Sequence, residues 1–282
     1  MAESAGLDVE ALARQHPGRR LERADVEAAI RQAVTAPPVA GAAPAITAIP
    51  APALDRRTPS HRQPAGSLRR LIAERMAFSA HTNAAVTLTT EADATELIRI
   101  RAGLKADPAT DVTPSYNALF AALVARALAE MPYMNASWDG TEIVRWDTVN
   151  IGIAVDTDRG LVVPVLRDVQ RKPPRTLARE MDELLSRAAQ GKALPDELTG
   201  STFTITNLGV YEIDAFTPII NPPECAVLGI GRLVDKVIPV GGAPAIRTCV
   251  VLSLTFDHRM VDGARDAGRH QRRRGRSGSP SA

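Results

Sequence analysis

A histidine at the end of an apolar, strand-like run is the residue of this sequence best placed for chemistry. The run LSLTF leads into Asp257-His258-Arg259, and Asp262-Gly263 follow closely. Imidazole titrates near neutral pH, so it can take a proton from a thiol of pKa about 8.5 and generate the attacking thiolate. We interpret His258 as a candidate general base. The alternative is a histidine whose hydrogen bonds are satisfied locally at a strand end.

The other reactive side chains are less distinctive. Asp262 lies four residues past His258 and could contact the imidazole directly, as the acid member of a triad would. Cys225 and Cys249 lie inside apolar runs, which predicts buried, reduced thiols and neither a disulfide nor a metal pair. We therefore expect no metal site.

The elements that must position these residues mix helices and strands without strict βαβ alternation. Apolar spacing predicts a first helix with Ser67 as its N-cap, a nearly all-apolar and hence buried helix at 115–131, and a last helix ended by Gly191. The segment GGAP predicts a turn between the last two strands. This order favours an α+β fold, a mixed β-sheet flanked by helices. Helices are expected at 67–80, 94–106, 115–131 and 176–192, and strands at 85–93, 149–156, 160–168, 201–209, 225–240 and 246–257.

Composition divides the chain into four parts. Residues 34–65 are dense in alanine and proline without helical or strand period, as is typical of an extended linker. Residues 1–33 before it contain two short stretches of helical spacing, which predict a partial small helical domain. Residues 66–264 form the main domain, and residues 265–282 are a basic, low-complexity tail that we expect to be disordered.

Charge and hydropathy exclude several classes of protein. The formal net charge is +2, and the tail carries six arginines, so the remainder of the chain is slightly acidic. The tail also lacks interleaved aromatic residues, which argues against nucleic-acid binding. No run of about 18 apolar residues and no signal-peptide pattern occurs, which predicts a cytoplasmic protein that does not bind membranes.

The segment DHRMVDG resembles the active-site signature DHRxxDG of the dihydrolipoamide acyltransferases, the core subunits of 2-oxo acid dehydrogenase complexes. A chance match at five fixed positions in a chain of this size has odds of roughly one in 10⁴. RRLIAERM, PSYNALFAALVARALAEMPYMNASW, VNIGIAVDTDRGLVVPVLRD and STFTITNLGVYEIDAFTPIINPPECAVLGIGR are also similar to segments of this family. The resemblance covers residues 66–264, which it identifies as an acyltransferase catalytic domain.

The resemblance implies a chloramphenicol-acetyltransferase-like fold that works as a homotrimer or higher oligomer with active sites between subunits. It implies transfer of an acyl group, with acetyl as the first choice, between a dihydrolipoyl thiol and coenzyme A. His258 would be the general base, and the hydroxyl of Thr206 would stabilise the oxyanion. An ordinary threonine-rich strand is the alternative explanation of Thr206. Asn207 and Gly209 are candidates for shaping the channel of coenzyme A.

In this family the carboxylate at the position of Asp262 is mainly architectural and pairs with an arginine near the start of the domain. Arg70 and Arg75 are the candidate partners. Residues 1–33 resemble half of the family's peripheral-subunit-binding domain, through which the chain would contact dehydrogenase subunits. Their arginines, whose alternative role is that of solvated surface residues, are Arg19, Arg20 and Arg23.

Two departures from the family pattern affect the expected function. This sequence contains no lipoyl domain, so we expect the lipoyl group to be supplied by another chain. After residue 264 the sequence lacks the apolar period of the family's C-terminal helix, which predicts trimers or irregular aggregates in place of large symmetric cores. The alternative function is therefore an inactive or structural assembly subunit of the same family.

Overall fold

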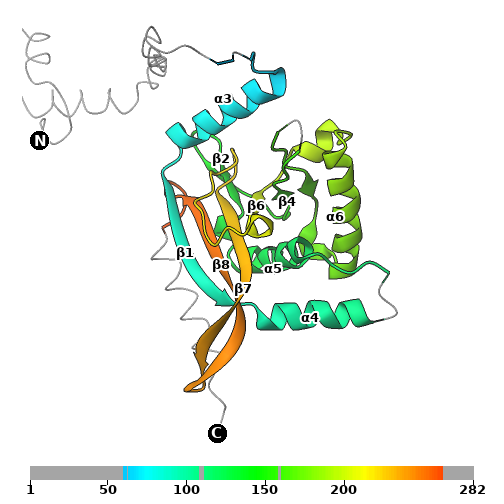
Figure 1. Ribbon diagram of the computed structural model, residues 1–282. Coiled ribbons are helices and arrows are strands. Elements are labelled where there is room, and N and C mark those ends of the chain that lie inside the picture. The colour runs from blue at the N-terminus through cyan, green and yellow to red at the C-terminus, as the bar shows by residue number, and fades with distance from the viewer. Residues whose placement is uncertain (1–59, 62, 108–110, 158–159, 263–282) are drawn as a thin grey trace, which may run out of the picture. The chain divides into compact units, whose positions relative to one another are not determined.

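A six-stranded mixed sheet is the centre of the structure, a computed structural model that describes residues 60–262 except 62, 108–110 and 158–159 (Figure 1). The strand order is β1-β8-β7-β6-β4-β5. The β7–β6 and β6–β4 pairs are parallel and the others antiparallel, so the predicted mixed sheet is confirmed. The strands are β1 (Ala85–Asp93), β4 (Ile151–Ile153), β5 (Val165–Leu166), β6 (Phe203–Asn207), β7 (Ala226–Val240) and β8 (Ala243–Asp257).

Four α-helices surround this sheet in the described part of the chain, and each matches a predicted helix. The N-cap prediction is wrong, because α3 begins at Ser67 itself with Gly66 as its extended N-cap and no side-chain cap. Gly191 follows α6 with φ 68°, which confirms the predicted glycine stop. The helices are α3 (Ser67–Thr82), α4 (Thr95–Ala106), α5 (Tyr116–Glu130) and α6 (Pro174–Ala189), and a two-stranded sheet comprises β2 (Ala136–Trp138) and β3 (Ile143–Arg145).

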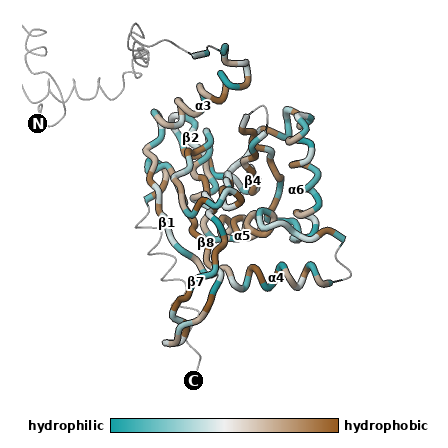
Figure 2. Tube along the Cα trace, in the orientation of Figure 1, coloured by the Kyte–Doolittle hydropathy of each residue, from teal (hydrophilic) through white to brown (hydrophobic). Residues whose placement is uncertain are grey.

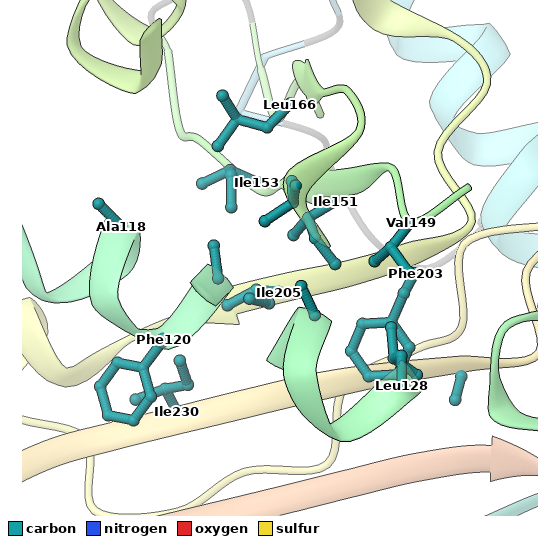
Figure 3. Close-up of a cluster of buried hydrophobic side chains, with 14 of the residues drawn as sticks. Ala118, Phe120, Leu128, Val149, Ile151, Ile153, Leu166, Phe203, Ile205 and Ile230 are labelled. Atoms are coloured by element: carbon teal, nitrogen blue, oxygen red, sulfur yellow. The ribbon is translucent and has the colours of Figure 1, made fainter. Parts of the chain in front are cut away.

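The main core lies between the sheet and helices α5 and α6. In Figure 2 the hydrophobic colour follows α5 and the central strands, whereas much of α6 is hydrophilic. Figure 3 shows Phe120 of α5 beside Ile230 of β7 and Leu128 of α5 beside Phe203 of β6, in the same buried cluster as the isoleucines of β4 and β6. The predicted burial of α5 is confirmed for the face that includes Ala118, Phe120 and Leu128, whereas Leu123 is 51% exposed.

Strands β7 and β8 form one long hairpin that ends at the candidate base. Gly241 and Gly242 have φ values of 59° and 86°, as a two-residue turn of this twist requires, and they confirm the predicted Gly-Gly turn. The described helices include none that is long and apolar enough to cross a membrane. The expected segments at 1–33 and 265–282, and most of the linker at 34–65, lie outside the described residues.

Candidate active site

His258 directly follows the last residue of β8, as the sequence predicted. Its backbone N–H donates to the carbonyl oxygen of Ala84 over 2.9 Å, which ties it to the residue before β1. The side chain is 49% exposed, and its ring centroid lies 6.1 Å from that of Phe256. The strand therefore fixes the backbone while leaving the imidazole accessible to a substrate.

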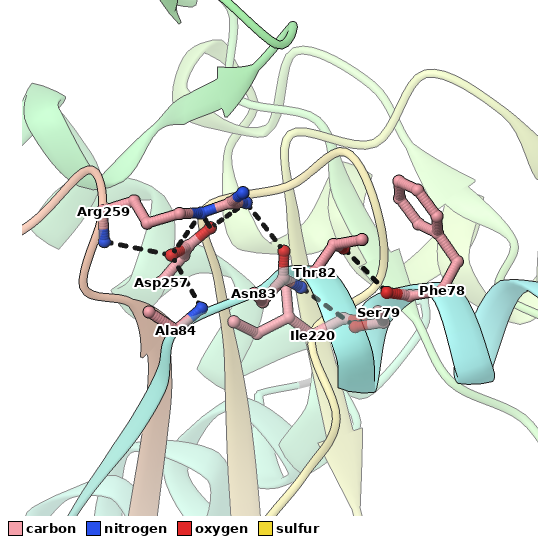
Figure 4. Close-up of polar contacts among 8 residues, drawn as sticks. All are labelled: Phe78, Ser79, Thr82, Asn83, Ala84, Ile220, Asp257 and Arg259. Carbon is pink, nitrogen blue, oxygen red and sulfur yellow. Dashed lines mark hydrogen bonds and ion pairs between the residues drawn. The ribbon is translucent and has the colours of Figure 1, made fainter. Parts of the chain in front are cut away.

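The two residues beside His258 form an ion pair that anchors the loop. The Asp257 carboxylate is buried and accepts hydrogen bonds from the backbone N–H groups of Ala84 and Arg259. The Arg259 guanidinium donates to both Asp257 oxygens and to Oδ1 of Asn83 (Figure 4). It also lies 5.3 Å from the ring centroid of Trp138. Such bidentate, charge-assisted pairs fix geometry as well as add stability. Asp257 and Arg259 thus hold the backbone of His258 on both sides.

The carboxylate of Asp262 lies beside the imidazole of His258. Its Oδ1 is 3.7 Å from Nδ1 of His258, because the backbone turns at 258–261, where the N–H groups of Met260 and Val261 both donate to the Asp257 carbonyl. Within the described ranges Asp262 makes no ion pair with Arg70 or Arg75, so that predicted pairing is not observed.

Arg75, one of the two expected partners, is engaged elsewhere. Its guanidinium donates to Oδ1 of Asn221 and to the Pro222 carbonyl. The direct contact of Asp262 with the base, which the sequence left open, is the arrangement that the chain adopts.

Thr206 lies in the middle of the sheet on strand β6. The strand register places it in one row with Gly229 on β7, Ser253 on β8 and Thr89 on β1. A Cβ atom on Gly229 would lie 3.0 Å from the ring of Phe216, so this glycine allows the aromatic ring to pack beside Thr206. The residues in register with Thr206 on β7 and β8 are therefore small, and the Phe216 ring packs against the first of them, Gly229.

Asn207 and Gly209 have contacts that explain them without a cofactor. The Asn207 amide donates to Oδ1 of Asn117 on α5 over 2.7 Å, and its Oδ1 accepts from the N–H of Gly209. A Cβ atom on Gly209 would lie 2.6 Å from the carbonyl oxygen of Gly231. Both residues thus close the turn after β6, and their suggested role in a coenzyme A channel stays a prediction.

The structure does not bring Thr206 and His258 together within one chain. Ser253 shares the row of Thr206 two strands away, and His258 stands five residues further along. With a rise of about 3.3 Å per residue and about 4.8 Å between strands, their Cα atoms lie roughly 19 Å apart. A hydroxyl that donates to an oxyanion must lie about 3 Å from it. One copy therefore cannot combine these two groups at one reacting carbon.

A buried acid, Glu224, lies in contact with the strand of Thr206 and was not predicted from the sequence. The side chain of Glu224 is buried, and its Oε1 accepts hydrogen bonds from Ser201, Thr204 and Asn221. Burial raises the pKa of this carboxyl to about 7, although the three donors lower it. The sequence signal was an acid that directly precedes the apolar run CAVLGIG.

The predicted state of the two cysteines is confirmed. Cys225 and Cys249 are both buried and free, and burial raises the pKa of the Cys225 thiol to about 12, which makes it a poor nucleophile. Over the described ranges, no group of three or more histidine, cysteine or acidic side chains could hold a metal ion.

A cavity of about 380 Å³ opens beside the Asp257–Arg259 ion pair, between the end of α3 and the loop at 222–224. Phe78, Trp138 and Met260 contribute to its walls. The side chain of His258 does not line it, so the cavity is not the reaction site of a single chain.

Residues 57–273 match the family model described as 2-oxoacid dehydrogenases acyltransferase (catalytic domain). The acetyltransferase component of the pyruvate dehydrogenase complex of Bacillus subtilis is 39% identical over 76% of this chain. The succinyltransferase component of the 2-oxoglutarate dehydrogenase complex of Haemophilus influenzae is 34% identical over 89% of this chain. The chain spans 49% and 62% of the length of these two relatives.

A solved structure of the dihydrolipoamide acetyltransferase of Azotobacter vinelandii superposes with a TM-score of 0.73 at 36% identity. The match covers 80% of this chain and 94% of that one. The expected acyltransferase fold is thereby confirmed.

Proposed function

The chain belongs to the family of 2-oxoacid dehydrogenase acyltransferases through their catalytic domain, and from this premise we propose that it transfers an acyl group between dihydrolipoyl and coenzyme A thiols. The observation that carries the proposal is the His258–Asp262 pair at the exposed end of β8. The pair offers an exposed imidazole as general base on a backbone held by the Asp257–Arg259 ion pair.

In the proposed reaction, Nε2 of His258 takes the proton of the attacking thiol. Asp262, whose Oδ1 lies 3.7 Å from Nδ1 in the structure, would accept from the Nδ1–H once substrate binding closes this distance, and the opposite nitrogen would then be free for the thiol proton. The thiolate attacks the carbonyl carbon of the thioester and forms a tetrahedral oxyanion. Collapse of this intermediate breaks the original carbon–sulfur bond, and the departing thiolate recovers the proton from His258.

The hydroxyl of Thr206 is the proposed donor to the oxyanion. The Azotobacter vinelandii structure was solved to investigate the roles of a serine, a histidine and an asparagine in the catalytic mechanism of that enzyme. That serine and histidine stand as far apart in their sequence as Thr206 and His258 do here, and the histidine and asparagine as far apart as His258 and Asp262. A threonine replaces the serine and an aspartate the asparagine, and each replacement keeps the required hydroxyl or acceptor oxygen.

We propose that the reaction site forms between copies of the chain in a homotrimer. The separation of Thr206 and His258 supports this, because only two copies can bring a hydroxyl and an imidazole to one carbonyl carbon. A rotational arrangement of three chains uses the same pair of surfaces three times and therefore creates three equivalent sites.

Acetyl is the proposed acyl group. The Phe216 ring beside Gly229, the register partner of Thr206, gives an apolar wall that suits a methyl group better than a second carboxylate. The Bacillus subtilis acetyltransferase component is also the more identical of the two relatives described above.

The test is an assay of dihydrolipoamide acylation by acetyl-coenzyme A, with succinyl-coenzyme A in parallel. We expect turnover with the acetyl donor and at least tenfold lower kcat/KM with the succinyl donor. His258→Ala should lower kcat about 100-fold or more, and His81→Ala, at an exposed histidine on α3, should not. A folded, oligomeric wild-type chain without turnover would instead support the alternative of a structural assembly subunit.

A further inference from the structure

Glu224 is a buried acid that the proposed reaction does not use. It lies in the loop that leads into β7, and its carboxyl is in contact with β6, the strand of Thr206. Ser201, Thr204 and Asn221 all donate to Oε1, whereas Oε2 is buried and has no hydrogen-bond partner in the described part of the chain. An acid held in this way is a poor anion, because one of its two oxygens would carry charge without a donor.

The contacts of Glu224 reach the strand of the proposed oxyanion donor. Thr204, which donates to Glu224 over 2.9 Å, points to the same face of β6 as Thr206, because side chains two residues apart in a strand share a face. A Cβ atom on Gly152 of β4 would lie 2.9 Å from the Thr204 hydroxyl, so the neighbouring strand leaves space for this contact. The carboxyl of Glu224 therefore holds Thr204, the nearest residue to Thr206 on the same face of β6.

The same loop is tied to the strand end that carries His258. The hydroxyl of Ser79 on α3 donates to the Ile220 carbonyl over 2.5 Å and accepts from the amide of Asn83. Asn83 in turn accepts from Arg259, next to His258 (Figure 4). A continuous set of hydrogen bonds thus joins the loop at 220–224 to the end of β8.

The charged groups around Glu224 are few. Arg75 on α3 donates to Asn221 and to the Pro222 carbonyl, and its charge lowers the pKa of Glu224. Asp257 and Arg259 line the same cavity from the end of β8, but they neutralise each other as an ion pair. From β6 and the loop the neighbours are the neutral groups of Ser201, Thr204 and Asn221.

We propose that Glu224 is a positioning residue that supports acyl transfer only as a neutral acid, so that its ionisation turns the reaction off. The proposal rests on the acyl transfer proposed above. The Glu224 carboxyl contacts Thr204, two residues before Thr206 on β6. Its ionisation would therefore place a negative charge near the oxyanion that forms at Thr206, and two like charges close together in a protein interior repel strongly. It would also require a donor for Oε2, which the loop can supply only by moving.

The experiment measures kcat for dihydrolipoamide acylation between pH 5.5 and 9 in the full chain and in three variants. Wild-type kcat should fall about tenfold between pH 7 and 8.5 as Glu224, whose pKa is about 7, ionises. Glu224→Gln keeps the acceptor oxygen without the charge, so it should stay within twofold of its maximum over that interval. Glu130→Gln is the matched control, because Glu130 is an exposed acid at the last position of α5, and it should keep the wild-type pH profile.

Arg75→Gln provides a second variant, at an exposed position, should Glu224→Gln fail to fold. Loss of the arginine charge makes ionisation of Glu224 harder, so the falling limb of kcat should move to higher pH. If the wild type is active and kcat of either Glu224→Gln or Arg75→Gln falls over the same pH interval as that of the wild type, this inference is overturned and the proposed function stays intact. A wild-type chain with no turnover at any pH overturns the proposed function and this inference with it.

Discussion

Arg259 donates to both carboxylate oxygens of Asp257, and His258 is the residue between them in the chain. The Asp257 side chain is fully buried and that of Arg259 is 33% exposed. The pair therefore sits at the boundary of the interior, where an unpaired carboxylate is costly. The pair holds the backbone on both sides of His258 and so limits the positions that its imidazole can take.

Removal of the arginine should test how much this platform contributes. Arg259→Met leaves Asp257 buried without its main partner, and we expect a loss of about 2 kcal/mol in the free energy of unfolding, less than for a fully buried pair because Arg259 is partly exposed. The measurement is thermal unfolding with kcat in parallel, which should fall with the stability. The control is Arg99→Met, since Arg99 and Glu96 form an ion pair at the surface that contributes at most about 1 kcal/mol.

Asp262 should affect the rate and not the fold. Its side chain is 63% exposed and contacts His258, so Asp262→Ala should lower kcat about tenfold and leave the melting temperature nearly unchanged. Asp262→Asn keeps an acceptor oxygen for the Nδ1–H and should recover most of the rate. A marked drop in melting temperature for the alanine variant would restore the architectural role expected from the family resemblance.

Thr206 should act through its hydroxyl alone. Thr206→Val keeps the shape and the β-branched preference for a strand, so the fold should be retained while kcat falls about 100-fold with little change in KM. Thr206→Ser keeps the donor and should stay within a few-fold of the wild type. Equal kcat in the valine variant and the wild type would show that another group stabilises the oxyanion.

The sequence predicted the elements of the fold well, because apolar period, glycine turns and helix stops are local signals. Gly191 and the Gly241-Gly242 turn could be recognised for this reason. It did not predict that Glu224 is buried, since burial there depends on Ser201 and Asn221, which only the folded loop brings together. The sequence left the partner of Asp262 open between His258 and an arginine of the first helix, because the turn at 258–261 decides it and no periodic pattern describes that turn.

The buried state of Glu224 should also appear in the stability of the protein. Its pKa is raised from an ordinary 4.5 to about 7 in the folded chain, so the folded state holds a proton that the unfolded state releases between these values. This contribution is fully present below pH 4.5 and is lost as pH rises toward 7. Glu224→Gln removes it, so the wild type should lose stability relative to the variant from pH 4.5 to 7 and then level off. Urea unfolding at several pH values measures the difference, and parallel stability curves would contradict it.

A mixture of two inactive variants gives the sharpest test of where the reaction site lies. If each site takes His258 from one chain and Thr206 from the next, a trimer that mixes His258→Ala and Thr206→Val chains contains some sites with both native residues. Random assembly at equal amounts places the two intact residues together in about one interface in four, so co-expression should recover about a quarter of the wild-type kcat. Each variant expressed alone is the control and should show only its own low rate. If the co-expressed mixture is no faster than the controls, both residues of a site must come from one chain, and the roughly 19 Å between them would have to close by a rearrangement of the sheet.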